Sequence, residues 1–253
     1  MIEVKSVRPL GGPAASGGLI RLFILIRLFI MCVAALALIA AQVLGAQAHS
    51  LDEVDAMLGD KEKYFQIIDE PAPDFKLQSS DGRAVQLADL RGKVLILHFI
   101  YTSCPDVCPL HTERLAQIQA MVNSTPMKDR VRFVTITTDP SKDTPEVLGD
   151  YAAARGLDTA NWLFLTTTPD QPEDTTRKLA EAFGHKFSKT DDGLQMHGIV
   201  THAIDKGGRW KANFHGLNFD SVNLVTFVNA LTNDVGVPHG HEKKSWWSWI
   251  WDW

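Results

Sequence analysis

A pair of cysteines in one short turn constrains the fold of this chain more than any other feature. Cys104 and Cys108 are separated by three residues, in a turn that also contains prolines. Residues 94–101 before the turn are aliphatic and aromatic, as in a buried strand, and residues 111–122 after it repeat apolar side chains at helical spacing. Pro109 suits the first position of that helix, which makes Cys108 the residue before it. We therefore predict a strand, a cysteine turn and a helix whose positive end favours the Cys108 thiolate.

The first 48 residues have the pattern of a signal peptide or a membrane anchor. A basic segment precedes an uncharged apolar run at residues 28–41, and the small residues Ala46 and Ala48 follow it as a cleavage site. An uncleaved anchor over residues 28–46 is the alternative, because this stretch is nearly long enough to cross a bilayer. On either interpretation, the preceding positive charges predict that the rest of the chain lies in the periplasm or on the extracytoplasmic face of the inner membrane. These charges belong to Lys5, Arg8, Arg21 and Arg27.

The remainder of the chain is acidic and has few cysteines. Without the first 48 residues it carries 21 basic and 29 acidic side chains, a net charge of −8 with neutral histidines, which disfavours nucleic acid as a partner. Its two cysteines are too few for a multiply cross-linked scaffold. We divide this part into a polar lead-in at residues 49–72, a folded domain at residues 73–235 and a His/Trp-rich tail at residues 236–253. The tryptophans of the tail suit either a membrane interface or a partner surface, and a tail without fixed structure is the alternative.

Alternating strand and helix patterns predict an α/β fold, a mixed sheet flanked by helices with an added N-terminal β-hairpin. The parallel strands of such a sheet need helical crossovers, whereas the two hairpins are antiparallel. The predicted hairpins cover residues 73–87 and 198–214. The predicted strands between them are residues 94–101, 131–137 and 162–166. The predicted helices are residues 111–122, 144–155, 173–183 and 221–231.

Three kinds of chemistry remain open for the two cysteines. A structural disulfide would close too small a loop to constrain a domain of this size by much. Thiol–disulfide exchange is open, although enzymes of the thioredoxin type have two residues, not three, between their cysteines. A metal site is the third, since two thiolates and an imidazole suit copper or zinc.

The imidazole ligand has to come from nine histidines, and spacing alone does not choose it. His98 lies in the predicted buried strand and is expected to be a core residue, and His111 is expected to turn outward from its helix. His197 and His202 flank the penultimate strand, on opposite faces if the strand is regular. The others are His49, His185, His215, His239 and His241.

The cysteine turn, Tyr101-Thr-Ser-Cys-Pro-Asp-Val-Cys-Pro109, resembles the metal-binding motif of the Sco/SenC family of copper-binding, thioredoxin-fold proteins. The resemblance covers roughly residues 70–231. It extends to Pro73-Asp-Phe, Leu90-Arg-Gly-Lys-Val94, Thr138-Asp-Pro with Asp143-Thr-Pro145, and His197 eleven residues before Gly208. The Trp-rich tail has no counterpart in the family pattern.

This resemblance implies a thioredoxin-like fold and a copper metallochaperone that assists assembly of the CuA centre of cytochrome c oxidase. Its implied copper ligands are Cys104, Cys108 and His197, and the site holds Cu(I) and Cu(II). Asp139 resembles a family acid that supports the site. His202 stands where the family often has Tyr, which makes it a competing ligand. The implied partners are a copper-receiving oxidase subunit and a thiol–disulfide reductant.

An enzymatic alternative uses the same two cysteines as a redox-active pair. In this hypothesis the protein is a thiol–disulfide oxidoreductase that reduces the cysteines of a copper-receiving partner, with Cys104 or Cys108 as the attacking thiolate. Peroxidase activity is a further alternative, because thioredoxin-fold peroxidases share the general layout, but the sequence identifies no peroxidatic cysteine pocket.

Overall fold

A computed structural model describes residues 25–31, 51–190 and 193–233, which belong to two compact units divided after Ala48. In the first unit, residues 25–31 form a helix. Within the described ranges, no helix combines the length and the apolar character that crossing a bilayer requires. Most of the predicted signal or anchor segment and the His/Trp-rich tail lie outside the described residues, so both remain predictions.

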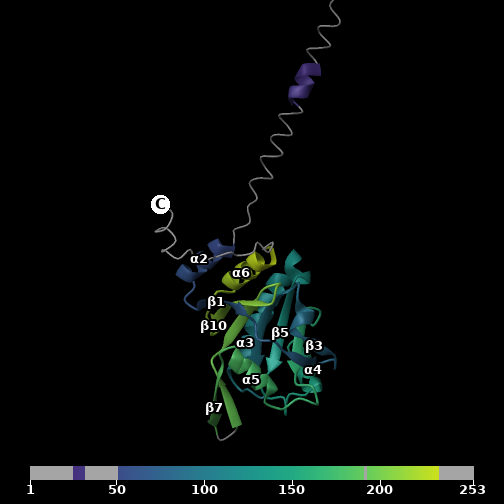
Figure 1. Ribbon diagram of the computed structural model, residues 1–253, viewed down its shortest axis with the longest axis vertical. Coiled ribbons are helices and arrows are strands. Elements are labelled where there is room, and N and C mark those ends of the chain that lie inside the picture. The colour runs from purple at the N-terminus through teal and green to yellow at the C-terminus, as the bar shows by residue number, and fades with distance from the viewer. Residues whose placement is uncertain (1–24, 32–50, 191–192, 234–253) are drawn as a thin grey trace, which may run out of the picture. The chain divides into compact units, whose positions relative to one another are not determined.

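An eight-stranded mixed sheet forms the centre of the second unit, in the spatial order β1-β10-β9-β4-β5-β6-β2-β3 (Figure 1). Neighbouring strands β4, β5 and β6 are parallel, and the other pairs are antiparallel. The strands are β1 (Phe65–Pro71), β2 (Lys76–Ser79), β3 (Ala84–Gln86), β4 (Val94–Ile100), β5 (Val131–Thr137), β6 (Trp162–Thr166), β9 (Val200–Ile204) and β10 (Arg209–His215). A separate two-stranded sheet pairs β7 (Lys186–Thr190) with β8 (Gly193–His197).

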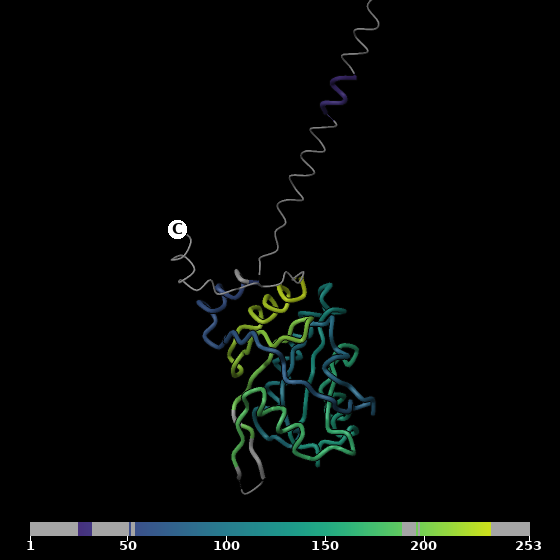
Figure 2. The backbone as a smooth tube through the Cα atoms, viewed as in Figure 1, coloured from purple at the N-terminus to yellow at the C-terminus, as the bar shows by residue number. Residues whose placement is uncertain are grey.

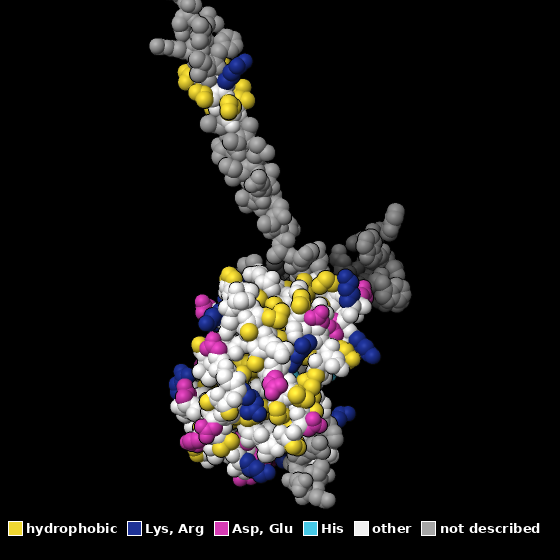
Figure 3. Space-filling model, turned by 180° about the vertical axis from the view of Figure 1, so that it is seen from behind, with side chains coloured by type: hydrophobic (Ala, Val, Ile, Leu, Met, Phe, Trp, Pro, Cys, Tyr) yellow, Lys and Arg dark blue, Asp and Glu magenta, His cyan; other side chains and the backbone are white. Residues whose placement is uncertain are grey.

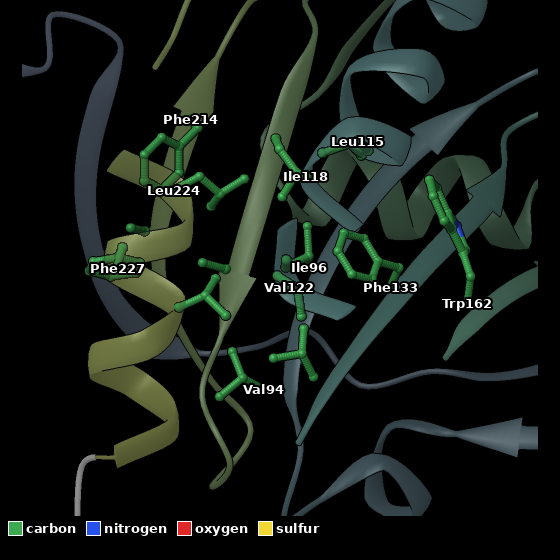
Figure 4. Packing of buried hydrophobic residues seen from close by; sticks show 14 of the residues in the cluster. Val94, Ile96, Leu115, Ile118, Val122, Phe133, Trp162, Phe214, Leu224 and Phe227 are labelled. Atoms are coloured by element: carbon green, nitrogen blue, oxygen red, sulfur yellow. The ribbon is translucent and has the colours of Figure 1, made fainter. Parts of the chain in front are cut away.

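Helices cover both faces of the central sheet. The first face packs against α2 (Leu51–Lys61), α3 (Val107–Asn123), α4 (Pro145–Ala154) and α6 (Ser221–Asn233). The second face packs against α5 (Thr175–Ala182) and the 3₁₀ segment Leu87–Leu90. A further 3₁₀ turn is Pro126–Asp129. Figure 4 shows apolar side chains of α3 and α6 directed at the strands of the first face. Because β4 is covered on both faces, all of its residues are buried, which explains its uninterrupted apolar sequence.

Most of the predicted elements are confirmed. Strands β5 and β6 have the predicted bounds, and the predicted hairpin pairs β2 with β3. Thr144 caps α4 by accepting a hydrogen bond from a first-turn amide, with Pro145 at the start of the helix. The chain after α5 turns at Gly184, whose φ of +86° favours glycine.

The predicted polar lead-in at residues 49–72 contains both α2 and β1. Leu58 of α2 is fully buried in the first core, α2 packs beside α6, and β1 pairs with β10 (Figure 1). The hairpin of β7 and β8 was also missed. It projects from the body of the domain, as the tube in Figure 2 shows.

The face seen in Figure 3 carries acidic and basic side chains interspersed with single apolar residues. Scattered apolar side chains of this kind are normal on the surface of a globular domain.

Candidate metal centre

The turn between β4 and α3 holds two free thiols inside the protein. Cys104 and Cys108 are only 6% and 4% exposed, and neither forms a disulfide. The Cys104 amide donates to the Tyr101 carbonyl at 3.1 Å, which folds the backbone back on itself. The Cys108 amide belongs to the first turn of α3 and donates to the Cys104 sulfur at 3.4 Å. The end of a buried strand and the start of a helix therefore meet at these two sulfurs.

The two thiols have opposite pKa shifts. Burial alone would raise the pKa of Cys104, but hydrogen bonds from the Asp106 amide and from the thiol and amide of Cys108 outweigh it and lower this pKa. Burial raises the pKa of Cys108 to about 12, and the nearby charges of Cys104 and Asp143 act in the same direction. Burial and a hydrogen bond to Cys104 also raise the pKa of Tyr101 to about 12, so its hydroxyl keeps its proton at neutral pH.

The prediction that the helix end favours the Cys108 thiolate is therefore wrong. Helix α3 begins at Val107 rather than at Pro109, so Cys108 lies inside the first turn, where burial dominates its pKa. The amides at the helix N-terminus instead stabilise the Cys104 thiolate, which lies just before the helix.

The buried carboxylate of Asp143 forms hydrogen bonds with the start of the cysteine turn. Asp143 is fully buried and accepts a hydrogen bond from the Thr102 amide at 3.0 Å, and also from the hydroxyls of Thr102 and Thr137. Asp139, which the sequence suggested as the supporting acid, instead forms an ion pair with exposed Lys142 at 3.2 Å. The carboxylate that contacts the turn is thus Asp143, four residues further along the same segment. Its signal in the sequence was the Asp-Thr-Pro motif before α4.

His197 is the last residue of β8, where its Cα pairs with that of Lys186 in β7. Its side chain lies outside the described residues. Among the described side chains, no three His, Cys, Asp or Glu residues are grouped closely enough to hold a metal ion. His197 therefore remains the predicted third ligand.

His202, the competing ligand, faces away from the cysteines. The cysteines belong to the core on the first face of the sheet, whereas the ring of His202 contacts Phe99, Phe183 and Trp210, which belong to the core on the second face. Both of its nitrogens are engaged, Nε2 with His185 at 3.0 Å and Nδ1 with Asn213 at 2.7 Å. The idea that His202 competes for the metal is thus contradicted by its position.

His111 and His98 lie together on the same face as the cysteines. The prediction that His111 turns outward is wrong, because it is 2% exposed and Nε2 lies 2.8 Å from the Thr201 hydroxyl. His98 is a core residue as predicted, and its ring centroid lies 4.9 Å from that of His111. Burial lowers the pKa of both, that of His111 to about 3, so both rings are neutral at physiological pH.

Comparison with known proteins identifies the family of this chain. Residues 68–230, well over half of the chain, match the family model described as SCO1/SenC. The chain belongs to the SCO1/SenC family. The resemblance seen in the cysteine turn is thus confirmed, and the SCO1/SenC match spans the strands and helices that carry both thiols and His197.

Individual relatives of this SCO1/SenC protein agree in fold. It is 32% identical over 143 residues to a SCO2-like protein of Rickettsia prowazekii, covering 56% of this chain and 67% of the relative. A SCO1/SenC family lipoprotein from Bacillus anthracis superposes with a TM-score of 0.59 at 26% identity, over 66% of this chain and 97% of that one. Arabidopsis thaliana ScoI, solved with copper bound, gives a TM-score of 0.53 at 25% identity, over 62% of this chain and 98% of that one. The predicted thioredoxin-like mixed sheet flanked by helices is confirmed by these neighbours.

Proposed function

We propose that this protein is a copper metallochaperone that carries copper on Cys104, Cys108 and His197. Its acceptor would be the copper-receiving subunit of cytochrome c oxidase, during assembly of the CuA centre. The observation that carries this proposal is the pair of free, buried thiols at the junction of β4 and α3. Membership of the SCO1/SenC family supports it, and so does a structural neighbour described as having copper bound.

The donor set fits copper in both oxidation states. Two soft thiolates suit Cu(I), and an added imidazole nitrogen makes Cu(II) tolerable. Oxidation of the two thiols to a disulfide would abolish binding, because only thiolates act as ligands. Copper loading would therefore follow the redox state of the cysteines, and a thiol–disulfide reductant is the second partner that we propose.

The same proposal includes an extracytoplasmic location, in the periplasm or on the outer side of the inner membrane. Residues 1–48 would act as a signal peptide or anchor, which supports this location. A cleaved N-terminus at His49 in the mature protein would distinguish the signal peptide from the anchor.

Anaerobic copper titration of the reduced full-length protein tests the ligand set. We expect one copper per chain, with the Cu(II)–thiolate charge-transfer absorption lost in Cys104→Ala and in Cys108→Ala. His197→Ala should weaken Cu(II) binding more than Cu(I) binding. His215→Ala is the matched control, because His215 is half-buried in β10 and its ring bonds to the side chain of Gln66, at 2.8 Å. Unchanged Cu(II) affinity in His197→Ala would remove His197 from the ligand set.

Thiol–disulfide exchange is the second candidate, and the lowered pKa of Cys104 favours it. A thiolate stabilised by helix amides is a suitable attacking group, and the neighbouring Cys108 could resolve the mixed disulfide. The Cys104 thiolate would attack the partner disulfide, forming a mixed disulfide and releasing one partner thiolate. The Cys108 thiolate would then attack the Cys104 sulfur, forming the Cys104–Cys108 disulfide and releasing the second partner thiolate. Reduction of a partner disulfide by metal-free protein that shows no copper affinity would favour this candidate over the chaperone.

A further inference from the structure

The hairpin that ends at His197 is attached to the domain through its base. In the described part of the chain, β7 and β8 pair with each other and not with the eight-stranded sheet. His185 immediately precedes β7, and β9 begins three residues after His197. Near the base, Phe187 of β7 pairs with Met196 of β8. Both side chains are partly buried and pack against the core on the second face of the central sheet. The position of His197 therefore depends on how this base is fixed.

A direct bond between two histidines closes the base. His185 Nε2 and His202 Nε2 lie 3.0 Å apart, although the residues are 17 positions apart in the chain. His185 is 5% exposed and His202 is fully buried, so neither imidazole has ready access to water. The bond joins the residue before β7 to the strand that follows β8.

The surrounding groups dictate the direction of this bond. Trp210 Nε1 can only donate, and it contacts Asn213 Oδ1 at 2.8 Å, so this Asn213 atom is the amide oxygen. His202 Nδ1 lies 2.7 Å from the same oxygen and must therefore carry a proton. A neutral His202 then has an unprotonated Nε2, which accepts a hydrogen bond from the Nε2–H of His185.

Aromatic rings hold both imidazoles in these orientations. The His185 ring lies edge-on to Phe99, at 5.1 Å between centroids, and the His202 ring lies 4.9 Å from Phe183. Trp210 contacts His202 from another side, at 5.3 Å. Contacts of this kind restrict ring rotation, so the bond is both directional and fixed.

We propose that His185 and His202 form a clamp that positions His197 for copper. This inference rests on the proposed function, because it assigns the two histidines to the support of a copper ligand that they do not replace. His185 and His202 are positioning residues. The clamp restrains the hairpin base, so His197 is presented to the two thiolates without a large ordering cost when Cu(II) binds. Cu(I), held by the two thiolates, does not depend on it.

The test compares three variants of the reduced full-length protein. His185→Phe with His202→Phe removes both partners of the bond and keeps aromatic packing. We expect this double variant to fold, because neither partner is left buried without the other. His185→Gln retains a donor of similar reach and should rescue the clamp. His215→Phe is the matched control, since it replaces a half-buried histidine of β10 whose ring bonds to Gln66 at 2.8 Å and leaves the His185–His202 bond in place. Circular dichroism establishes that each variant is folded before titration.

We expect the double variant to lose about tenfold or more in Cu(II) affinity, in the range known for groups that orient metal ligands. Its Cu(II) paramagnetic resonance spectrum should shift toward that of His197→Ala, while Cu(I) affinity stays within about threefold, too small a change to indicate a lost ligand. His185→Gln and His215→Phe should resemble the wild type. If the double variant does not fold, His185→Phe alone against His185→Gln gives the same comparison.

Three results would overturn the clamp, and they are distinguishable. If the wild type binds copper and responds to His197→Ala, but the clamp variants keep the wild-type spectrum and Cu(II) affinity, the inference fails and the proposed function stands. If the wild type binds no copper, both fail together. An equal loss of Cu(I) and Cu(II) affinity would also contradict the clamp, because it would indicate general damage to the domain.

Discussion

Acidification from pH 7 to pH 5 should destabilise this domain through histidines that it buries in neutral form. Four histidines are concerned, and burial lowers the pKa of each. The pKa is about 3 for His111 and about 4 for His185, and it is well below 6.5 for His98 and His202. In the unfolded chain each returns to about 6.5. Between the two pKa values the unfolded state binds more protons than the folded state, so the free energy of unfolding falls as the pH falls below 6.5.

The size of the effect follows from these shifts. Each pH unit below the unfolded pKa costs about 1.4 kcal/mol per histidine that stays neutral in the fold. At pH 5, His111 and His185 therefore cost about 2 kcal/mol each. His98 and His202 act in the same direction. The total is a large fraction of the 5–15 kcal/mol, roughly, by which domains are stable.

Urea unfolding of copper-free protein at pH 7, 6 and 5, followed by tryptophan fluorescence, measures this dependence. Carboxyl groups with lowered pKa, such as Asp81 at about 2, begin to contribute only at lower pH, so the interval from 6.5 to 5 reports mainly on histidine. The slope of the free energy of unfolding against pH reflects the difference in bound protons between the unfolded and folded states. His185→Phe with His202→Phe should reduce this difference by about two protons. A free energy of unfolding that is the same at pH 7 and pH 5 would refute the reasoning, as would an unchanged slope in the double variant.

Three further predictions concern the cap of α4, the buried side of α2 and the thiols. Thr144→Ala should cost about 1 kcal/mol in chemical unfolding, because the cap of α4 is lost, whereas Thr144→Ser should cost little. Leu58→Ala should cost roughly 2–5 kcal/mol in the same assay, with Met57→Ala, at a 37% exposed position, as the control that changes little. Apparent Cu(I) affinity should rise about tenfold per pH unit for each proton released between pH 6 and pH 8, because Cys108 binds metal only after losing a proton from a thiol of pKa about 12. Competition titrations that show no pH dependence would contradict this last expectation.

The sequence predicted the elements whose signals are local. An uninterrupted apolar run predicted β4, and a Thr-Pro pair predicted the start of α4. Helix α2 was missed because five of its eleven residues are charged, although Leu51, Val54 and Leu58 do recur at helical spacing. These three side chains are buried only because α6 and the first face of the sheet lie against them. Such tertiary burial is not visible in a short window of sequence.

The candidate site was predicted in part for a related reason. Local sequence identified the two cysteines and the strand and helix around them, but not which sulfur the helix amides stabilise. That depends on a shift of two residues in the start of α3, which sequence patterns define poorly. Asp143 was passed over because its bonds reach back to Thr102 and Thr137, through a loop that no spacing rule describes.

The position of His202 shows how the sheet separates two roles that the sequence presented as rivals. Along β9, Thr201 reaches His111 on the side of the cysteines, and the next residue, His202, reaches His185 on the other side. Alternation along a strand makes this separation unavoidable, so His202 cannot reach the thiolates without disrupting β9. A polar ring in the second core must instead be satisfied there, and His185 and Asn213 satisfy it. Because His185 begins the hairpin that ends at His197, a bond required by burial on one face of the sheet also restrains the ligand that we propose for the copper site.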